Sequence, residues 1–173
     1  MTLDDAVALI AGAANRDGPA QTWADLGCGD GTFTKALAMT LPARSRIHAV
    51  DRDGAALRRI PAAVGATSIV THVADFTATP LPWTGLDGIL LANALHYVAD
   101  QPAFLKSLAP AIHGRARFLI VEYDTDHATP WVPYPVSRRR LGTLAAGGRW
   151  RLRPLGTRPS IYRQAALYAV LLE

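Results

Sequence analysis

The sequence has 173 residues, half of them hydrophobic, and a formal net charge of +4. This length and apolar content suit one sizeable core, so we expect residues 1–173 to form a single domain. The acidic start lacks the basic residues of a secretory signal, and no apolar run approaches the ~18 residues of a membrane-spanning helix. The single Cys28 excludes an internal disulfide and a cysteine zinc cluster. We therefore expect a soluble cytoplasmic protein without membrane contact or metal.

Helix-like and strand-like periodicities alternate along the first half of the chain. In chain order we expect a helix at 3–13, a strand at 22–26, a helix at 32–40, a strand at 47–50, a short helix ending near residue 60 and a strand at 68–73. Pro42 and Pro61 close the last two of these helices because proline has no backbone N–H to continue them.

The second half continues the alternation and ends differently. We expect a strand at 86–92, a helix at 100–109, a strand at 117–123, a helix at 136–146 stopped by Gly147 and Gly148, and two strands at 149–157 and 160–172. The run 86–92 is apolar enough to be buried on both faces of a sheet. The whole pattern predicts an α/β fold with a seven-stranded, mainly parallel sheet, helices on both faces and a C-terminal antiparallel hairpin.

A glycine-rich turn joins the first predicted strand to the helix that follows it. The segment reads Asp25-Leu26-Gly27-Cys28-Gly29-Asp30-Gly31, with glycines at alternate positions. A turn without side chains lets a ligand approach the backbone, and the free N–H groups of a helix start attract a carboxylate or phosphate. The third glycine comes one position earlier than in the dinucleotide fingerprint G-x-G-x-x-G. By itself the turn therefore predicts a nucleotide-like ligand, and its spacing argues against NAD.

The acid and the alternate glycines together resemble motif I, D-x-G-x-G-x-G, of the class I S-adenosylmethionine-dependent methyltransferases. The resemblance implies a Rossmann-like fold and S-adenosylmethionine as cofactor. It also implies cofactor-binding roles for the residues of the turn, namely Asp25, Gly27, Cys28, Gly29 and Gly31. We expect Cys28 to fill the loop and not to act as a nucleophile, because nothing near it in the sequence would lower its pKa.

Three further segments follow in the order of that family. Asp51 ends the second predicted strand, and the resemblance implies that it accepts hydrogen bonds from both ribose hydroxyls, with Arg52 beside it. Asp75 then matches the acid that accepts from the adenine amino group, with Phe76 as its ring neighbour. Asn93 ends the fourth predicted strand, facing the methyl donor. The alternative for both aspartates is a role as helix N-caps.

Fewer signals in the sequence describe the methyl acceptor. The candidate residues for its side of the site follow the fourth and fifth predicted strands, and they are His96, Tyr97, Glu122, Asp124, Asp126 and His127. We take His96 and Tyr97 as the catalytic candidates, since histidine accepts a proton from a hydroxyl near neutral pH. The alternative is a structural histidine packed under the next helix. The chain has no N-P-P-Y or D-P-P-Y after the fourth strand, which argues against methylation of base amino groups and favours a small-molecule acceptor.

Basic charge is concentrated at the C-terminal end. Residues 1–127 contain 10 Lys/Arg and 13 Asp/Glu, whereas residues 128–173 contain eight Arg and one Glu. Arg149, Arg151 and Arg153 alternate on a predicted strand and would share one face. We expect the C-terminal arginines to favour an anionic small molecule or an acidic protein surface over specific nucleic-acid binding, because Trp150 and Tyr162 among them look like sheet-core positions. The alternative is that these arginines only form a solvated face.

Other functions stay open at this point. The alternatives are an RNA- or protein-directed methyltransferase, a non-catalytic S-adenosylmethionine-binding partner subunit, and an NAD-binding module. The segment that would cover the acceptor, about residues 124–148, is short. The acceptor pocket is therefore either open or completed by another chain, in a homo-oligomer or with a partner subunit.

Overall fold

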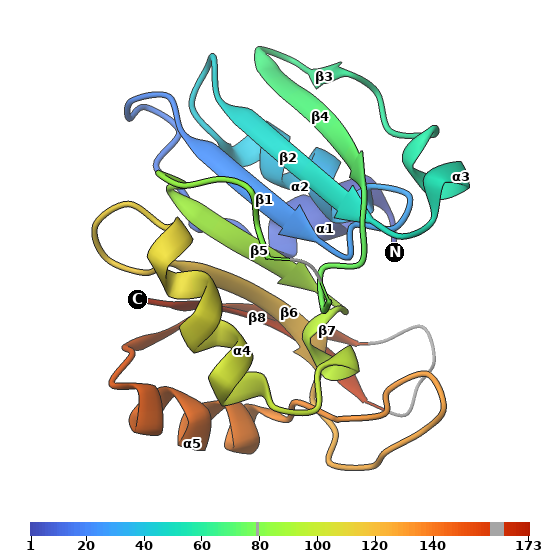
Figure 1. Ribbon diagram of the computed structural model, residues 1–173, viewed down its shortest axis with the longest axis vertical. Coiled ribbons are helices and arrows are strands. Elements are labelled where there is room, and N and C mark those ends of the chain that lie inside the picture. The colour runs from blue at the N-terminus through green and yellow to red at the C-terminus, as the bar shows by residue number, and fades with distance from the viewer. Residues whose placement is uncertain (79, 160–164) are drawn as a thin grey trace.

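The computed structural model describes residues 1–78, 80–159 and 165–173. One sheet runs through the described residues in the order β3-β4-β2-β1-β5-β6-β8-β7 (Figure 1). Its parallel part comprises β4 (Thr67–Val73), β2 (Arg46–Asp51), β1 (Thr22–Leu26), β5 (Gly88–Ala92) and β6 (Phe118–Tyr123). β8 (Ala166–Leu172) and β7 (Leu152–Pro159) close the sheet as antiparallel strands. The predicted α/β fold with a C-terminal antiparallel hairpin is confirmed.

The predicted number of seven strands was wrong by one. β3 (Ala63–Val64) pairs antiparallel with the start of β4, so the described sheet has eight strands. The two are joined by a tight turn at Gly65, which has a φ of +57°. Two residues are too few to give a period-2 pattern in a sequence.

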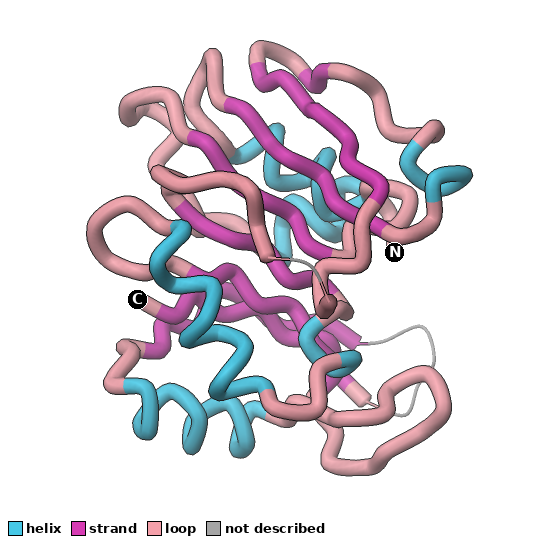
Figure 2. The backbone as a smooth tube through the Cα atoms, viewed as in Figure 1, coloured by secondary structure: helices cyan, strands magenta, loops and turns pink. Residues whose placement is uncertain are grey.

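Helices cover both faces of the sheet, as Figure 2 shows. α1 (Leu3–Leu9) and α2 (Thr32–Thr40) lie behind it in that view, and α4 (Gln101–Leu108) and α5 (Arg138–Gly148) lie in front. α3 (Gly54–Leu57) follows β2, and two 3-10 turns, η1 (Leu95–Tyr97) and η2 (Ala109–Ala111), flank α4. No helix in the described part of the chain has the length and apolar character needed to cross a membrane.

Alternate side chains of the central strands enter two separate cores. Phe118 and Ile120 of β6 pack with the residues under α4 and α5, whereas Leu119 and Val121 pack with those under α1 and α2. Ile89, Leu90 and Leu91 of β5 are likewise fully buried. This confirms that the apolar run at 86–92 is covered on both faces, which a parallel sheet between two helix layers requires.

Several predicted boundaries were wrong. α1 ends at Leu9 and not at residue 13, before Gly12, whose φ of +83° is left-handed. α5 continues through Gly147 and ends at Gly148, and it is capped by Arg149, which has a φ of +57°. The expected strand at 149–157 therefore begins at Leu152. Of the strand expected at 160–172, residues 160–164, with Tyr162, lie outside the described residues.

The five parallel strands all end at the same edge of the sheet. Their carboxyl ends bring together the segments that follow them, at residues 27–31, 52–53, 74–77, 93–97 and 124–127. In open α/β sheets this edge is where ligands bind.

Candidate active site

The glycine-rich turn between β1 and α2 is shaped by three left-handed glycines. The φ angles of Gly27, Gly29 and Gly31 are +75°, +54° and +79°. A Cβ on Gly27 would lie 2.9 Å from Ala94 Cβ, and one on Gly31 would lie 2.7 Å from Ile60 Cγ1, so both glycines allow close packing of the loop. A Cβ on Gly29 would meet nothing within 4 Å. Gly29 thus presents bare backbone to an open space.

Asp51 at the end of β2 fixes that turn. Its Oδ2 accepts from Gly29 N at 2.7 Å, and its Oδ1 accepts from Asp53 N at 2.9 Å. The helix cap expected as the alternative role of Asp51 belongs to Asp53, whose Oδ1 accepts from Ala55 N at 2.8 Å and Ala56 N at 3.1 Å. Each carboxylate oxygen of Asp51 keeps a second lone pair for a ligand.

Asp25 lies beneath the turn and is fully buried. Its Oδ2 accepts from Thr34 Oγ1 at 2.6 Å, while its Oδ1 has no partner within the described residues. Burial raises the pKa of Asp25 to about 7, with the charge of Asp51 adding to the effect and the Thr34 hydrogen bond opposing it. An unpartnered buried carboxylate oxygen costs stability unless a ligand supplies a donor.

Asn93 provides a second unpartnered oxygen. It follows β5 with a φ of +51°, and its Oδ1 is buried with no hydrogen-bond partner in the described structure. Asp25 lies on β1, Asn93 directly follows the neighbouring β5, and both line the same cavity. Two buried acceptors in one cavity favour a ligand that donates hydrogen bonds there, such as an ammonium group.

Asp75 and Phe76 follow β4 on the far side of the turn. The Oδ1 of Asp75 accepts from Thr77 N at 2.9 Å and from Thr77 Oγ1 at 2.6 Å, and these bonds lower the pKa of the exposed carboxyl. They close a turn and not a helix, so the N-cap alternative does not apply to Asp75 either. The Phe76 ring is half-buried, with its centroid 5.9 Å from that of Phe104.

A single cavity of about 960 Å³ joins these residues. The predicted cofactor residues that line it are Asp25, Gly27, Cys28, Gly29, Asp51, Arg52, Asp75, Phe76 and Asn93. Gly31 does not line it and instead packs against Ile60. Burial raises the pKa of the Cys28 thiol well above its usual range, which disfavours the reactive thiolate.

The two catalytic candidates lie in different environments. Tyr97 lines the cavity, and its side chain is 48% exposed. His96 is buried and does not line it. Its Nδ1 lies 2.7 Å from Glu122 Oε2, and its backbone N donates to Glu122 Oε1 at 3.2 Å. This geometry favours the structural alternative for His96, because the pair ties η1 to β6.

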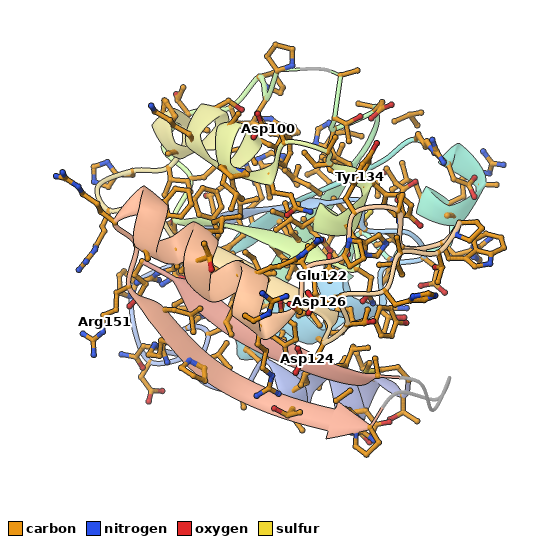
Figure 3. All side chains as sticks on the ribbon, turned by 90° about the horizontal axis from the view of Figure 1, so that it is seen from below. Asp100, Glu122, Asp124, Asp126, Tyr134 and Arg151 are labelled. Atoms are coloured by element: carbon orange, nitrogen blue, oxygen red, sulfur yellow. The ribbon has the colours of Figure 1, made fainter. Side chains whose placement is uncertain are left out.

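The other acidic residues expected near the acceptor also lie outside the cavity lining. Asp124 pairs with Arg138 at 3.2 Å, and Asp126 pairs with Arg139 at 2.9 Å. Figure 3 shows Glu122, Asp124 and Asp126 near the end of β6, with Arg151 at the amino-terminal end of β7, away from them. No three His, Cys, Asp or Glu side chains of the described residues are grouped so that they could hold a metal ion.

The predicted basic row on the last strands does not form. Arg149 is the C-terminal cap of α5 and Arg151 precedes β7, while Arg153 Nη2 donates to Gly12 O at 3.1 Å. None of the three lines the cavity. Trp150 is half-buried and packs edge-on against Phe118, in agreement with its expected core position.

Sequence reasoning missed one whole wall of the cavity. The missed lining residues come from the N-terminus and from β6, β7 and β8, and include Met1, Thr2, Asp5, Tyr123, Arg158, Pro159 and Leu167. The Asp5 Oδ1 to Arg158 Nη1 distance of 2.7 Å joins the first helix to the last hairpin. No motif marks these residues, because only folding brings together positions so distant in the chain.

Solved structures share the fold over the whole chain. A SAM-dependent methyltransferase from Aquifex aeolicus has a TM-score of 0.68 at 17% identity, with 97% of this chain and 89% of that chain covered. A SAM-dependent methyltransferase from Leishmania major has a TM-score of 0.73 at 17% identity, covering 99% and 71%. The magnesium protoporphyrin IX methyltransferase of Synechocystis with bound SAM has a TM-score of 0.64 at 15% identity, covering 99% and 77%.

Sequence comparison also finds proteins that are similar to this chain. An uncharacterized methyltransferase of Mycobacterium tuberculosis is 30% identical over 125 residues, which make up 68% of this chain and 62% of the relative. The chain therefore spans less than two thirds of the length of the curated relatives that it matches. Residues 24–113, just over half of the chain, match the family described as a methyltransferase domain. With its glycine-rich turn and fold in agreement, the chain belongs to the methyltransferase domain family.

Proposed function

We propose that the protein transfers a methyl group from S-adenosylmethionine to a small-molecule acceptor. The observation that carries this proposal is the pair of buried, unpartnered oxygens, Asp25 Oδ1 and Asn93 Oδ1, in the cavity beside Gly29. A ligand with an ammonium group satisfies such acceptors, and the bare backbone at Gly29 leaves room for it.

The remaining residues of the cavity fit the other parts of this cofactor. Asp51 has lone pairs left to accept from ribose hydroxyls, and Asp75 to accept from an adenine amino group beside the Phe76 ring. When bound, S-adenosylmethionine would supply an electrophilic methyl group, which an acceptor would attack in line with S-adenosylhomocysteine as the leaving group. The chain contributes mainly by orienting the acceptor and excluding water. No histidine lines the cavity within the described residues, so an acceptor that needs no strong base suits it best.

A small acceptor is supported by the size of the cavity. About 960 Å³ is at the upper end of the usual range for small-molecule sites, which leaves space beside a nucleoside-sized cofactor. The fold is shared with the magnesium protoporphyrin IX methyltransferase of Synechocystis, which is named for a small-molecule acceptor. The same cavity in a non-catalytic subunit would bind the cofactor without turnover.

Two measurements test the proposal in sequence. Calorimetry should show binding of S-adenosylmethionine and S-adenosylhomocysteine but not of NAD, and both ligands should raise the melting temperature. Transfer of a labelled methyl group is then followed into the small-molecule, RNA and protein fractions of a cell extract. Label in the small-molecule fraction supports the proposal. Label in RNA or protein, or binding without transfer, replaces it with the corresponding alternative, and binding of NAD alone overturns the cofactor assignment.

A further inference from the structure

The cavity has a second half that the cofactor residues do not form. Asp25, Asp51 and Asp75 belong to the part at the ends of β1, β2 and β4. The other lining residues include Tyr97 of η1 and Arg158 of β7, and Leu167, which pairs with Arg158 from β8, adds apolar surface. If the proposed function holds, this second half receives the methyl acceptor.

Tyr97 forms a rigid aromatic wall of this second half. Its ring centroid lies 4.4 Å from that of His96, and the backbone N of Tyr97 donates to Ala94 O at 3.1 Å. His96 is itself held by Glu122 at 2.7 Å in the core. A ring that is fixed from behind and open toward the cavity offers a flat surface for stacking against a planar molecule.

Arg158 is the positively charged residue in this second half of the cavity. The other lining arginine, Arg52, follows Asp51 and belongs to the cofactor half. The Arg158 Nη1 donates to Asp5 Oδ1, and Asp5 is itself anchored because its Oδ2 accepts from Thr2 N at 3.1 Å. Within the described residues the Arg158 side chain has no further hydrogen bond. A guanidinium carries five N–H groups, so a fixed Arg158 keeps donors for a second carboxylate.

We infer that the acceptor is a small planar acid, with its flat apolar body against Tyr97 and its carboxylate on Arg158. Asp5 holds the guanidinium in place, and the His96–Glu122 pair holds the tyrosine ring. This assignment gives the buried pair a positioning role in place of proton transfer. It also replaces the arginines at 149, 151 and 153 with Arg158 as the group that selects an anionic acceptor.

The test uses binding, which does not depend on knowing the natural acceptor. The protein is saturated with S-adenosylhomocysteine and titrated with 2-naphthoate, 2-naphthamide and cyclohexanecarboxylate in separate calorimetric experiments. 2-Naphthoate should bind at least about tenfold more tightly than the neutral amide and the non-planar acid, as expected for one charge-assisted contact and one stacking contact. Failure of S-adenosylhomocysteine to bind would refute the proposed function instead, so the two failures are distinguishable.

Variants assign the two contacts separately. Arg158→Gln should reduce 2-naphthoate affinity about tenfold, to the level of 2-naphthamide, and Tyr97→Leu should remove the preference for the planar acid. Arg153→Gln is the matched control on the same strand, because Arg153 contacts Gly12 O outside the cavity. S-Adenosylhomocysteine affinity should be unchanged in all three variants. Equal binding of the acid and the amide, no binding of 2-naphthoate to the saturated protein, or an unchanged affinity in Arg158→Gln would each overturn the inference.

Discussion

Individual carboxylates in and beside the cavity have different partners and therefore different roles. Asp53 caps α3, Asp75 closes a turn, and Asp51 bridges the glycine-rich turn to the end of β2. Asp25 alone among these four has a buried oxygen without a partner in the described residues. Two of these aspartates give predictions that a single substitution can test.

Asp51→Ala should weaken S-adenosylmethionine binding by at least about 1.5 kcal/mol, because hydrogen bonds to a charged acceptor are lost. The loss includes the support that Asp51 gives to Gly29 N. Asp53→Ala is the matched control, since it removes the cap of α3 without touching the cavity. Calorimetry on folded protein measures both. Equal cofactor affinity in Asp51→Ala would contradict the ribose-binding role.

Asp25 makes the free energy of unfolding depend on pH. Its pKa is about 7 in the folded protein and near 4 in the unfolded chain, so between these values the folded state holds a proton that the unfolded state has released. The contribution of Asp25 to the free energy of unfolding is therefore largest below about pH 4, falls as the pH rises to about 7 and is then constant. Asp25→Asn removes this pH dependence. The free energy of unfolding of the variant minus that of the wild type should therefore be a few kcal/mol larger at pH 8 than at pH 5.

Urea unfolding at pH 5 and pH 8 measures this difference for both proteins. The effects of other titrating groups cancel in the comparison because both proteins share them. A stability difference between Asp25→Asn and the wild type that is the same at both pH values would show that Asp25 titrates normally.

At the scale of elements, the glycine-rich turn and the β3–β4 turn contain glycines in the same conformation with different surroundings. Gly29 and Gly65 have φ angles of +54° and +57°, and a Cβ on either would meet nothing within 4 Å. They differ in that Gly29 lines the cavity and Gly65 does not. The pair thus separates backbone strain from occupation of the ligand space.

Gly29→Val and Gly65→Val should each cost about 1–2 kcal/mol of stability, from the left-handed backbone. Only Gly29→Val should abolish S-adenosylmethionine binding, since its side chain enters the cavity. Chemical unfolding and calorimetry on the two variants check this prediction. Retained cofactor affinity in Gly29→Val, or equal loss in both variants, would remove the turn from the binding site.

At the scale of the whole molecule, the basic C-terminal end is partly compensated in the folded structure. Arg138, Arg139 and Arg140 pair with Asp124 and Asp126, two acids that precede them in the chain. These exposed pairs contribute little stability, but they neutralise charge that the sequence alone presents as a cationic patch.

We therefore expect only weak nucleic-acid binding, with no sequence preference and a salt dependence that corresponds to few released counterions. Titration of single-stranded and duplex DNA and RNA at several salt concentrations measures it. Tight binding at physiological salt that is lost when Arg149, Arg151 and Arg153 are changed to alanine would instead support an RNA-directed enzyme.

The sequence alone determined the parallel part of the sheet, its two helix layers and the position of the predicted cofactor residues at the strand ends. Asp51, Asp75 and Asn93 each lie at or just after the end of a strand. Because parallel strands end at one edge of the sheet, local sequence patterns were sufficient to place these three residues there. The end of α5 was not predictable in this way. The helix runs through Gly148, where a Cβ would lie 2.8 Å from Trp150 Cε3, so the packing of Trp150 explains the glycine at this position.

Only the tertiary structure decided the contacts of Asp5, Arg158 and His96. Asp5 and Arg158 meet because β7 packs beside α1, and His96 turns into the core because Glu122 lies there on the adjacent strand. Neither contact has a periodicity or a spacing that a sequence could reveal. Local sequence patterns reflect the secondary structure of one segment. A wall of the cavity formed by α1 and the β7–β8 hairpin depends instead on how these distant segments pack together.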